Sequence, residues 1–136
     1  MAIEKKLNDF NSALNRLSEA VEITLANKDQ VTYSFFRDSA IQRFEFTLEI
    51  AWKSIKSFLL EYEGIECRSP KGCVREFLST GYLDNTQIST LLMMIDDRNL
   101  ATHTYHESLA NEIFDHIQEY LPILQNIYNL IQKKTE

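Results

Sequence analysis

The stretch Arg98-Asn99-Leu100-Ala101-Thr102-His103-Thr104-Tyr105 separates two segments of helical apolar spacing and predicts a junction between two helices. Asparagine and threonine are weak helix formers, because their side chains form hydrogen bonds with the nearby backbone. Thr104 and Glu107 have the spacing of a capping box, which predicts a new helix from near residue 104 with Tyr105 in its first turn. We therefore expect one helix to end and the next to begin within residues 100–104.

Helices are predicted on both sides of this junction. Upstream, Asp84 and Gln87 have the spacing of a second capping box, and the apolar residues that follow lead directly to Arg98. Downstream, apolar residues recur at helical spacing as far as Ile131, and Pro122 lies within that pattern. Because proline lacks a backbone donor and clashes with the preceding turn, the sequence predicts a kink or a break there.

The first half of the chain predicts three more helices. Apolar stripes indicate a first helix over residues 2–26 and a second from about residue 34 to residue 62, with Gly64 as its natural end. Ser69 followed by Pro70 is typical of a helix start and predicts a short third helix.

The second predicted helix is apolar on more than one face. Phe46, Ile50 and Trp52 lie off its main stripe, which indicates a helix that is either central or part of an interface. No segment shows the alternation of a strand, and no repeat is visible. The sequence therefore predicts an all-α, up-and-down four-helix bundle with one additional short helix, in a single domain of residues 1–136.

Composition limits the classes of function. The 136 residues are 44% hydrophobic and 25% charged, with a net charge of −6, which argues against broad coating of nucleic acid. A local basic site and a basic protein partner remain open. The longest apolar run, residues 91–95, is far shorter than the roughly 20 residues of a membrane span. The amino-terminal residues begin an amphipathic pattern rather than a signal peptide, so we expect a cytoplasmic protein.

Cys67 and Cys73 are expected to be ordinary free thiols. Two cysteines alone do not complete a four-ligand zinc site, and a reducing cytosol disfavours a disulfide.

The junction stretch also carries chemistry. Arg98 presents a planar cation that fits a phosphate, and His103 can donate or accept a proton near neutral pH. On one unbroken helix their side chains would point about 140° apart, so convergence requires a helix end or a second chain. The alternative is structural: Arg98 forms a salt bridge with Asp96 or Asp97, and His103 is satisfied at the junction.

The pattern Arg-x4-His-x-Tyr, formed by Arg98, His103 and Tyr105, resembles the signature of the HEPN superfamily. Within that superfamily the chain is similar to the nucleotidyltransferase substrate-binding proteins. The segment Arg43-Phe-Glu-Phe-Thr-Leu-Glu-Ile-Ala-Trp-Lys53 and the Ser69-Pro70 helix start support the same resemblance, which spans roughly residues 30–120.

The resemblance implies a toxin-like, metal-independent endoribonuclease that acts as a homodimer on an RNA substrate. Arg98 and His103 would be catalytic: the RNA 2′-OH attacks its own phosphorus, the imidazole moves a proton and the guanidinium stabilises the phosphoryl oxygens. Tyr105 would accept AMP from a partner minimal nucleotidyltransferase, the antitoxin, and the added charge would block the phosphate site. The alternative is a non-catalytic substrate-binding subunit that docks the transferase. A purely structural helical scaffold is a third interpretation.

Other residues have smaller roles in this hypothesis. Asn99, Arg43 and Lys53 are possible cleft-lining residues, and no cofactor and no metal site is expected. His106 stands where members of the family that the chain resembles often carry an acidic residue, so its role is open. The chain itself has no Gly-Ser turn followed by an Asp-x-Asp pair, so it is not expected to be the transferase.

Overall fold

The computed structural model describes residues 2–136, and every regular element in this range is helical. This confirms the predicted all-α class. The elements are α1 (Ala2–Ala26), α2 (Tyr33–Phe58), the π-helical turn η1 (Leu59–Glu63), α3 (Pro70–Ser79), α4 (Asn85–Leu100), the short 3₁₀ turn η2 (Ala101–His103) and α5 (Glu107–Thr135).

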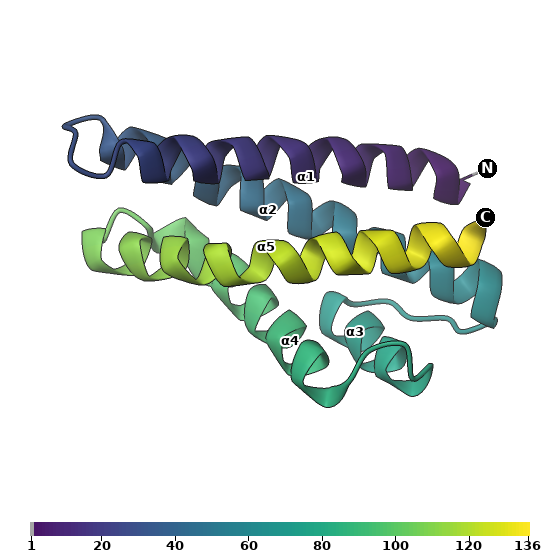
Figure 1. Ribbon diagram of the computed structural model, residues 1–136. Coiled ribbons are helices and arrows are strands. Elements are labelled where there is room, and N and C mark those ends of the chain that lie inside the picture. Colours follow the sequence, from purple (N-terminus) through teal and green to yellow (C-terminus); the bar gives the residue numbers. More distant parts are fainter. Residues whose placement is uncertain (1) are drawn as a thin grey trace.

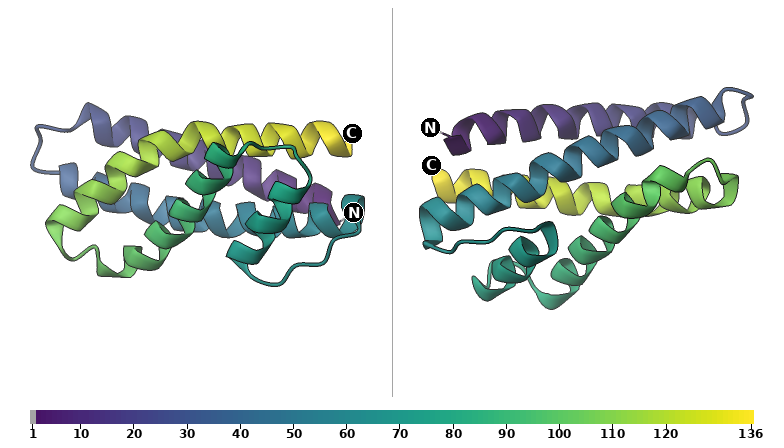
Figure 2. Two further views of the ribbon diagram at one scale, coloured as in Figure 1. Left: turned by 90° about the horizontal axis from the view of Figure 1, so that it is seen from below. Right: turned by 180° about the vertical axis from the view of Figure 1, so that it is seen from behind.

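Three long helices form the body of the molecule. α1 and α2 are antiparallel neighbours, and α5 lies along both of them (Figure 1). α4 diverges from the start of α5 at an angle, with α3 beside it, so these two helices cover one side of the body (Figures 1 and 2). The two chain ends lie at the same end of the bundle, and the α4–α5 junction lies at the opposite end. Within residues 2–136, none of the helices is both long enough and apolar enough to cross a bilayer.

The core lies where the apolar stripes meet. Phe10 from α1, Phe44 from α2 and Phe114 from α5 are each 0% exposed, and the ring of Phe44 stacks on that of Tyr120 at 5.7 Å between centroids. Burying one such side chain stabilises the fold by roughly 1.5–3 kcal/mol. The predicted stripe of α1 is buried from Ile3 to Val21, which explains why a helix of this length holds its position on the bundle.

The predicted helix starts and ends are present. The Ser69 side chain accepts a hydrogen bond of 3.0 Å from the Gly72 backbone N–H, and Asp84 and Gln87 form the expected reciprocal capping box. Gly64 follows the π-helical turn with a φ of 67°, a left-handed conformation that glycine adopts without a Cβ clash.

Of the kink or break predicted at Pro122, the break is wrong, because α5 runs without interruption from Glu107 to Thr135. A proline inside a helix costs about 3 kcal/mol through the lost hydrogen bond and the clash. Tyr120 and Leu124, on either side of it, are 2% and 0% exposed. Burial of this apolar stripe against the other helices outweighs the local cost.

The expectation of two free thiols is also wrong, because Cys67 and Cys73 form a disulfide. The turn at Ser69 and Pro70 reverses the chain between them and brings their Cα atoms to 5.1 Å, within the range that a disulfide spans. The redox compartment and the number of cysteines do not reveal this local geometry, which depends on the turn between the two residues. The bridge ties the segment before α3 to the first turn of that helix.

Candidate functional site

The candidate site lies at the junction of α4 and α5, where His103 and Tyr105 are both exposed. The side chain of Tyr105 is 75% exposed, and its hydroxyl lies 3.3 Å from Nδ1 of His103. The rings of His103 and Tyr105 meet edge to face with centroids 5.9 Å apart, and the ring of His106 lies 4.5 Å from that of Tyr105 at a tilt of 41°. The solvent-exposed phenol of Tyr105 therefore contacts two imidazoles.

The helix junction is present, but its capping differs from the prediction. α5 begins at Glu107, its N-cap is His106, and that residue forms no side-chain capping bond. The hydroxyl of Thr104 instead donates a 2.9 Å hydrogen bond to the Ala101 carbonyl, in the turn that closes α4. Thr104 has φ −74° and ψ 5°, whereas an N-cap residue is usually extended, so Tyr105 lies in the turn before α5 and not in its first turn.

Arg98 and His103 are not in contact within one chain. The guanidinium of Arg98 forms a 2.9 Å salt bridge with Glu49 of α2, so the predicted structural partners Asp96 and Asp97 are wrong. Its Nε atom is buried and has no hydrogen-bond partner among residues 2–136. A helix end lies between Arg98 and His103, as their convergence would require. However, Arg98 contacts Glu49 and His103 contacts Tyr105.

The carboxylate of Glu49, on the surface of α2, interacts with three donor side chains. Besides Arg98 it accepts a 3.1 Å hydrogen bond from Nε1 of Trp52 and pairs with Lys53 at 3.1 Å. Partial burial raises the pKa of Glu49, but the hydrogen bonds from Trp52 and Lys53 and the charge of Arg98 outweigh that effect and lower it overall. The carboxylate therefore stays ionised and holds Arg98.

The three possible cleft-lining residues do not converge on one site. Asn99 shares with Arg98 and Trp52 a hollow of about 380 Å³, which also reaches Lys71 at the start of α3. Arg43 lies in a different hollow between α1 and α2, where it donates a 2.8 Å hydrogen bond to the Arg16 carbonyl. Lys53, paired with Glu49, is part of a third.

Arg37 anchors the beginning of α5 and was not singled out from the sequence. This side chain is 2% exposed. Its guanidinium donates hydrogen bonds to both carboxylate oxygens of Glu107 and to the side-chain oxygen of Asn111 at 2.9 Å. It also donates two hydrogen bonds to Asp38, at 2.9 and 3.1 Å. The hydrogen bond from Arg37 lowers the pKa of Glu107. The network fixes the residue two positions after Tyr105. The available signal was that Arg37 falls on the buried stripe of α2, three residues before Ala40.

A second buried network lies immediately before Arg98. One oxygen of Asp97 accepts a 2.5 Å hydrogen bond from the Tyr120 hydroxyl and lies 2.8 Å from Nδ1 of His116. Burial first, and then the hydrogen bond and charge of Asp97, raise the pKa of Tyr120, which therefore remains a neutral donor. The network joins the last turn of α4 to the middle of α5. The adjacent residues Asp96 and Asp97 therefore have different environments. Asp97 is part of the buried network, whereas Asp96 is exposed and pairs with Lys71 at 2.6 Å.

Metal ligation has no support from geometry in the described part of the chain. Among residues 2–136, no three histidine, cysteine, aspartate or glutamate side chains are arranged to hold a metal ion. His103 and His106 instead each contact the Tyr105 ring.

Comparisons with known proteins agree with this architecture. Residues 5–133 match the family model described as nucleotidyltransferase substrate binding protein like. A crystal structure from Thermus thermophilus is 34% identical, with a TM-score of 0.72 over 85% of this chain and 98% of that one. The structure of HI0074 from Haemophilus influenzae, described as revealing the fold of a substrate binding domain of a nucleotidyltransferase, is 22% identical. It has a TM-score of 0.76 over 93% of this chain and 98% of its own and shows the same fold. No curated protein matches.

The family model covers nearly the whole chain, and the Thermus protein exceeds 30% identity over most of it. The protein belongs to the nucleotidyltransferase substrate binding protein family.

Proposed function

We propose that this protein is the substrate-binding subunit of a nucleotidyltransferase and that the exposed turn at residues 103–106 is the part it presents to the transferase. The observation that carries the proposal is the Tyr105 hydroxyl, exposed on a short turn and 3.3 Å from Nδ1 of His103. The family supports a transferase as partner.

The turn has the groups that a nucleotidyl acceptor requires. A phenol is a poor nucleophile while protonated, and a neighbouring imidazole can take its proton as the attack proceeds. The tautomer of His103 with its proton on Nε2 accepts a hydrogen bond from the Tyr105 hydroxyl through Nδ1. The chemistry of nucleotide binding and metal ions would come from the transferase.

The proposed reaction transfers AMP from ATP to Tyr105. The phenolic oxygen attacks the α-phosphorus, a new O–P bond forms, and the bond from that phosphorus to the leaving pyrophosphate breaks. His103 takes the phenolic proton. The product carries a bulky anion on the turn that joins α4 to α5, close in sequence to Arg98.

Anchoring on both sides makes the turn a defined target. Arg37 holds the first residue of α5 through Glu107, and Asp97 ties the end of α4 to Tyr120. An acceptor held in one place loses little conformational freedom when it enters a second protein's active site.

The test is mass spectrometry of the protein after incubation with its nucleotidyltransferase, ATP and Mg²⁺. Wild type should gain one AMP, and Tyr105→Phe should gain none. Tyr62→Phe is the matched control, because Tyr62 is also exposed, at 41%, and lies on η1. His103→Ala should slow the modification. Equal modification of the Tyr105→Phe protein would refute the proposed acceptor.

A metal-independent endoribonuclease toxin is the second candidate, favoured by the exposed imidazole of His103. This activity needs Arg98 as well, and Arg98 is held by Glu49, so the cation would have to exchange that carboxylate for an RNA phosphate. A homodimer would supply the second acid or base that in-line cleavage uses. In this scheme AMP on Tyr105 would silence the nuclease.

An RNA-cleavage assay in EDTA separates the two candidates. Cleavage by wild type that is lost in both Arg98→Ala and His103→Ala would establish the nuclease. Absence of cleavage, together with AMP on Tyr105, would leave the substrate-binding subunit as the function.

A further inference from the structure

A continuous furrow runs along the α1–α2 pair on the side away from α5. Three hollows of about 470, 320 and 230 Å³ share lining residues from one to the next: the first two share Asp9 and Ile50, and the last two share Lys6 and Lys53. Seen from behind, α1 and α2 lie in front with no further helix over them (Figure 2). The furrow therefore follows the antiparallel helix pair as an open groove.

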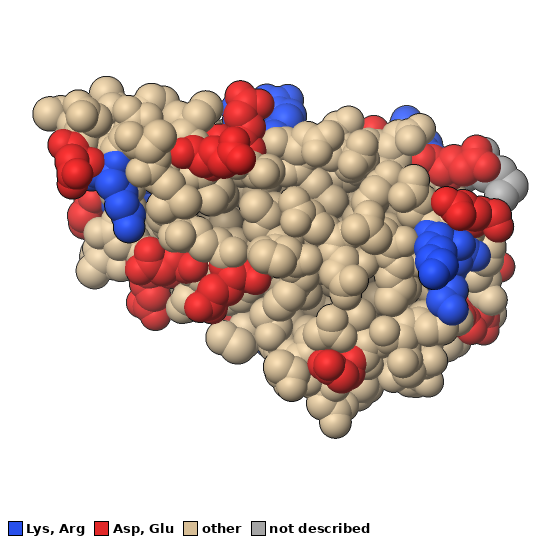
Figure 3. Space-filling model, viewed as in Figure 1, with Lys and Arg blue, Asp and Glu red and all other residues tan. Residues whose placement is uncertain are grey.

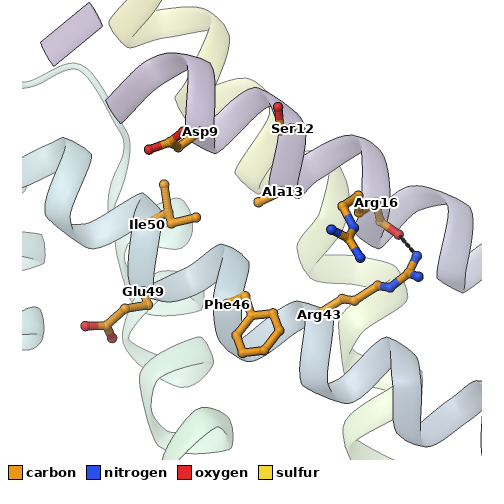
Figure 4. Close-up of a pocket in the computed structure, with 8 residues that line it drawn as sticks. All are labelled: Asp9, Ser12, Ala13, Arg16, Arg43, Phe46, Glu49 and Ile50. Atoms are coloured by element: carbon orange, nitrogen blue, oxygen red, sulfur yellow. Dashed lines mark hydrogen bonds between the residues drawn. The ribbon is translucent and has the colours of Figure 1, made fainter. Parts of the chain in front are cut away.

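The floor of the furrow is apolar. Phe46 and Leu60 are each 56% exposed, and the half-buried Ile50 and Trp52 lie between them along α2. Figure 4 shows Ile50 on α2 pointing toward the side of α1 that carries Ala13, and Phe46 exposed one turn earlier on α2. These are the residues that lie off the main stripe of α2, so the second apolar face of this helix is the floor of the furrow.

The rim of the furrow is basic, in contrast to the chain as a whole. Its lining includes six basic side chains and two acidic ones, whereas the chain has 14 Lys and Arg residues against 20 Asp and Glu residues. The face seen in Figure 3 shows more acidic than basic side chains. Lys5, Lys6 and Lys56 have no ion-pair partner among residues 2–136, while Lys53 pairs with Glu49. The basic side chains are Lys5, Lys6, Arg16, Arg43, Lys53 and Lys56.

We propose that this furrow binds an amphipathic helix of a partner protein that carries acidic residues on both edges of its apolar face. Leucine-like side chains would replace water over Phe46, Ile50 and Leu60, and the flanking carboxylates would pair with the lysines. An apolar centre with a polar rim is the anatomy of a protein–protein interface, and a helix in a groove is a standard form of recognition.

The dimensions of the furrow fit such a helix. From Arg43 to Leu60 it follows α2 for on the order of 25 Å, at 1.5 Å per residue, which equals the length of a helix of about 17 residues. Two antiparallel helices leave a groove between them in which a third packs at 8–10 Å between axes. The proposal does not depend on Tyr105, because none of the residues that line the furrow belongs to the proposed acceptor turn.

Trp52 provides a direct measurement, because it is the only tryptophan of the chain and lines the furrow. The probe is a synthetic peptide of about 17 residues with leucine at positions i, i+3, i+4 and i+7 and glutamate beside them. It should shift the emission of Trp52 saturably, with an affinity that falls as salt rises. The same peptide with lysine in place of glutamate should bind at least about tenfold more weakly, because like charges then meet across the interface.

Matched variants locate the binding surface. Lys53→Glu with Lys56→Glu should weaken the peptide at least about tenfold, whereas Arg68→Glu with Arg75→Glu, the same charge change outside the furrow, should have little effect. Phe46→Ala should also weaken binding. Phe35→Ala is its control, since Phe35 is 73% exposed on the same helix and does not line the furrow.

Several outcomes would overturn the proposal. Equal binding of the acidic and basic peptides would show that the lysines of the furrow do not select acidic residues. A Trp52 shift with a single-stranded oligouridylate but not with the acidic peptide would assign the furrow to nucleic acid. A wild-type dimer in light scattering that Phe46→Ala converts to a monomer would assign it to a second copy of the chain. Because none of these readouts involves AMP transfer to Tyr105, each leaves the proposed function unaffected.

Discussion

The exposed turn and the two networks that flank it have opposite environments, although Asp97 and Glu107, which connect the networks to the turn, are within ten residues of Tyr105 in sequence. Tyr105 is 75% exposed, whereas Arg37 is 2% and Asp97 is 9% exposed. Polar groups in the turn interact mainly with one another and with solvent, while Arg37 and Asp97 are each held by at least two side chains. The proposed chemistry is thus placed on a short exposed segment, and the polar groups that fix its position are in the helices.

The comparison shows how a helical bundle can hold one exposed side chain, here the proposed acceptor Tyr105, in a defined place. Buried polar groups require all their partners, because an unpaired one costs about 1–3 kcal/mol. Such networks therefore specify one register between neighbouring helices. The residues of the turn are mostly exposed, so we expect substitutions there to have little effect on stability, which would assign stability and proposed function to different residues.

The largest effect is expected from the loss of the Arg37 anchor. Arg37→Ala removes a buried side chain with its hydrogen bonds to Glu107, Asn111 and Asp38, and the cavity and lost bonds should reduce the free energy of unfolding by about 3 kcal/mol. Urea denaturation followed by circular dichroism measures the change. Arg68→Ala is the control, since Arg68 is exposed and pairs only with Glu66. A loss for Arg37→Ala no larger than that of the control would show that the network does not anchor α5.

The neighbours Asp96 and Asp97 provide a matched pair for the next effect. Asp97→Ala leaves the Tyr120 hydroxyl, on a side chain 2% exposed, without its acceptor, and should cost about 2 kcal/mol. Asp96→Ala removes only a pair with Lys71 on the surface and should cost at most about 0.5 kcal/mol. Thermal unfolding of the two variants checks the difference. Equal losses of stability in the two variants would contradict the different environments assigned to Asp96 and Asp97.

A pH dependence should distinguish Glu107 from an ordinary surface carboxylate. The hydrogen bond from Arg37 lowers the pKa of Glu107 in the folded protein, so the ionised form stabilises the fold. This contribution is fully present above the unfolded pKa of about 4.3 and is lost as pH falls through the lower folded value. The stability difference between wild type and Glu107→Gln should therefore be constant near neutral pH and disappear at acid pH. A difference that grows on acidification would contradict the assigned direction.

The sequence predicted elements whose signals are local and missed those that depend on contacts between helices. Ser69 with Pro70 and Asp84 with Gln87 determine their helix starts through neighbouring backbone groups, so the capping patterns were sufficient. The same pattern at Thr104 failed, because the residue closes the turn after α4 instead. Spacing alone does not distinguish these two uses of a threonine.

The candidate site shows the same limit. His103 and Tyr105 are two residues apart, and their contact follows from the motif. Arg98 and its partner Glu49 are 49 positions apart in the sequence, and Arg37 and Glu107 are 70 positions apart. Such pairs depend on the register of packed helices. The second apolar face of α2 was predictable from the sequence, because Phe46, Ile50 and Trp52 lie off the main apolar stripe of the helix. This spacing is visible whether or not another element packs on that face.

The smallest effect on stability is expected at the turn itself. Tyr105→Phe removes a hydroxyl that has an exposed imidazole as its neighbour, so the free energy of unfolding should change by no more than about 0.5 kcal/mol. Tyr120→Phe is the informative contrast, because it removes the same atom from a buried hydrogen bond to Asp97 and should cost about 1–2 kcal/mol. Chemical denaturation of the two variants compares one hydroxyl in two environments. If Tyr105→Phe were the more destabilising of the two, the turn would be part of the structural framework, and its tyrosine would not be free to enter another protein's active site.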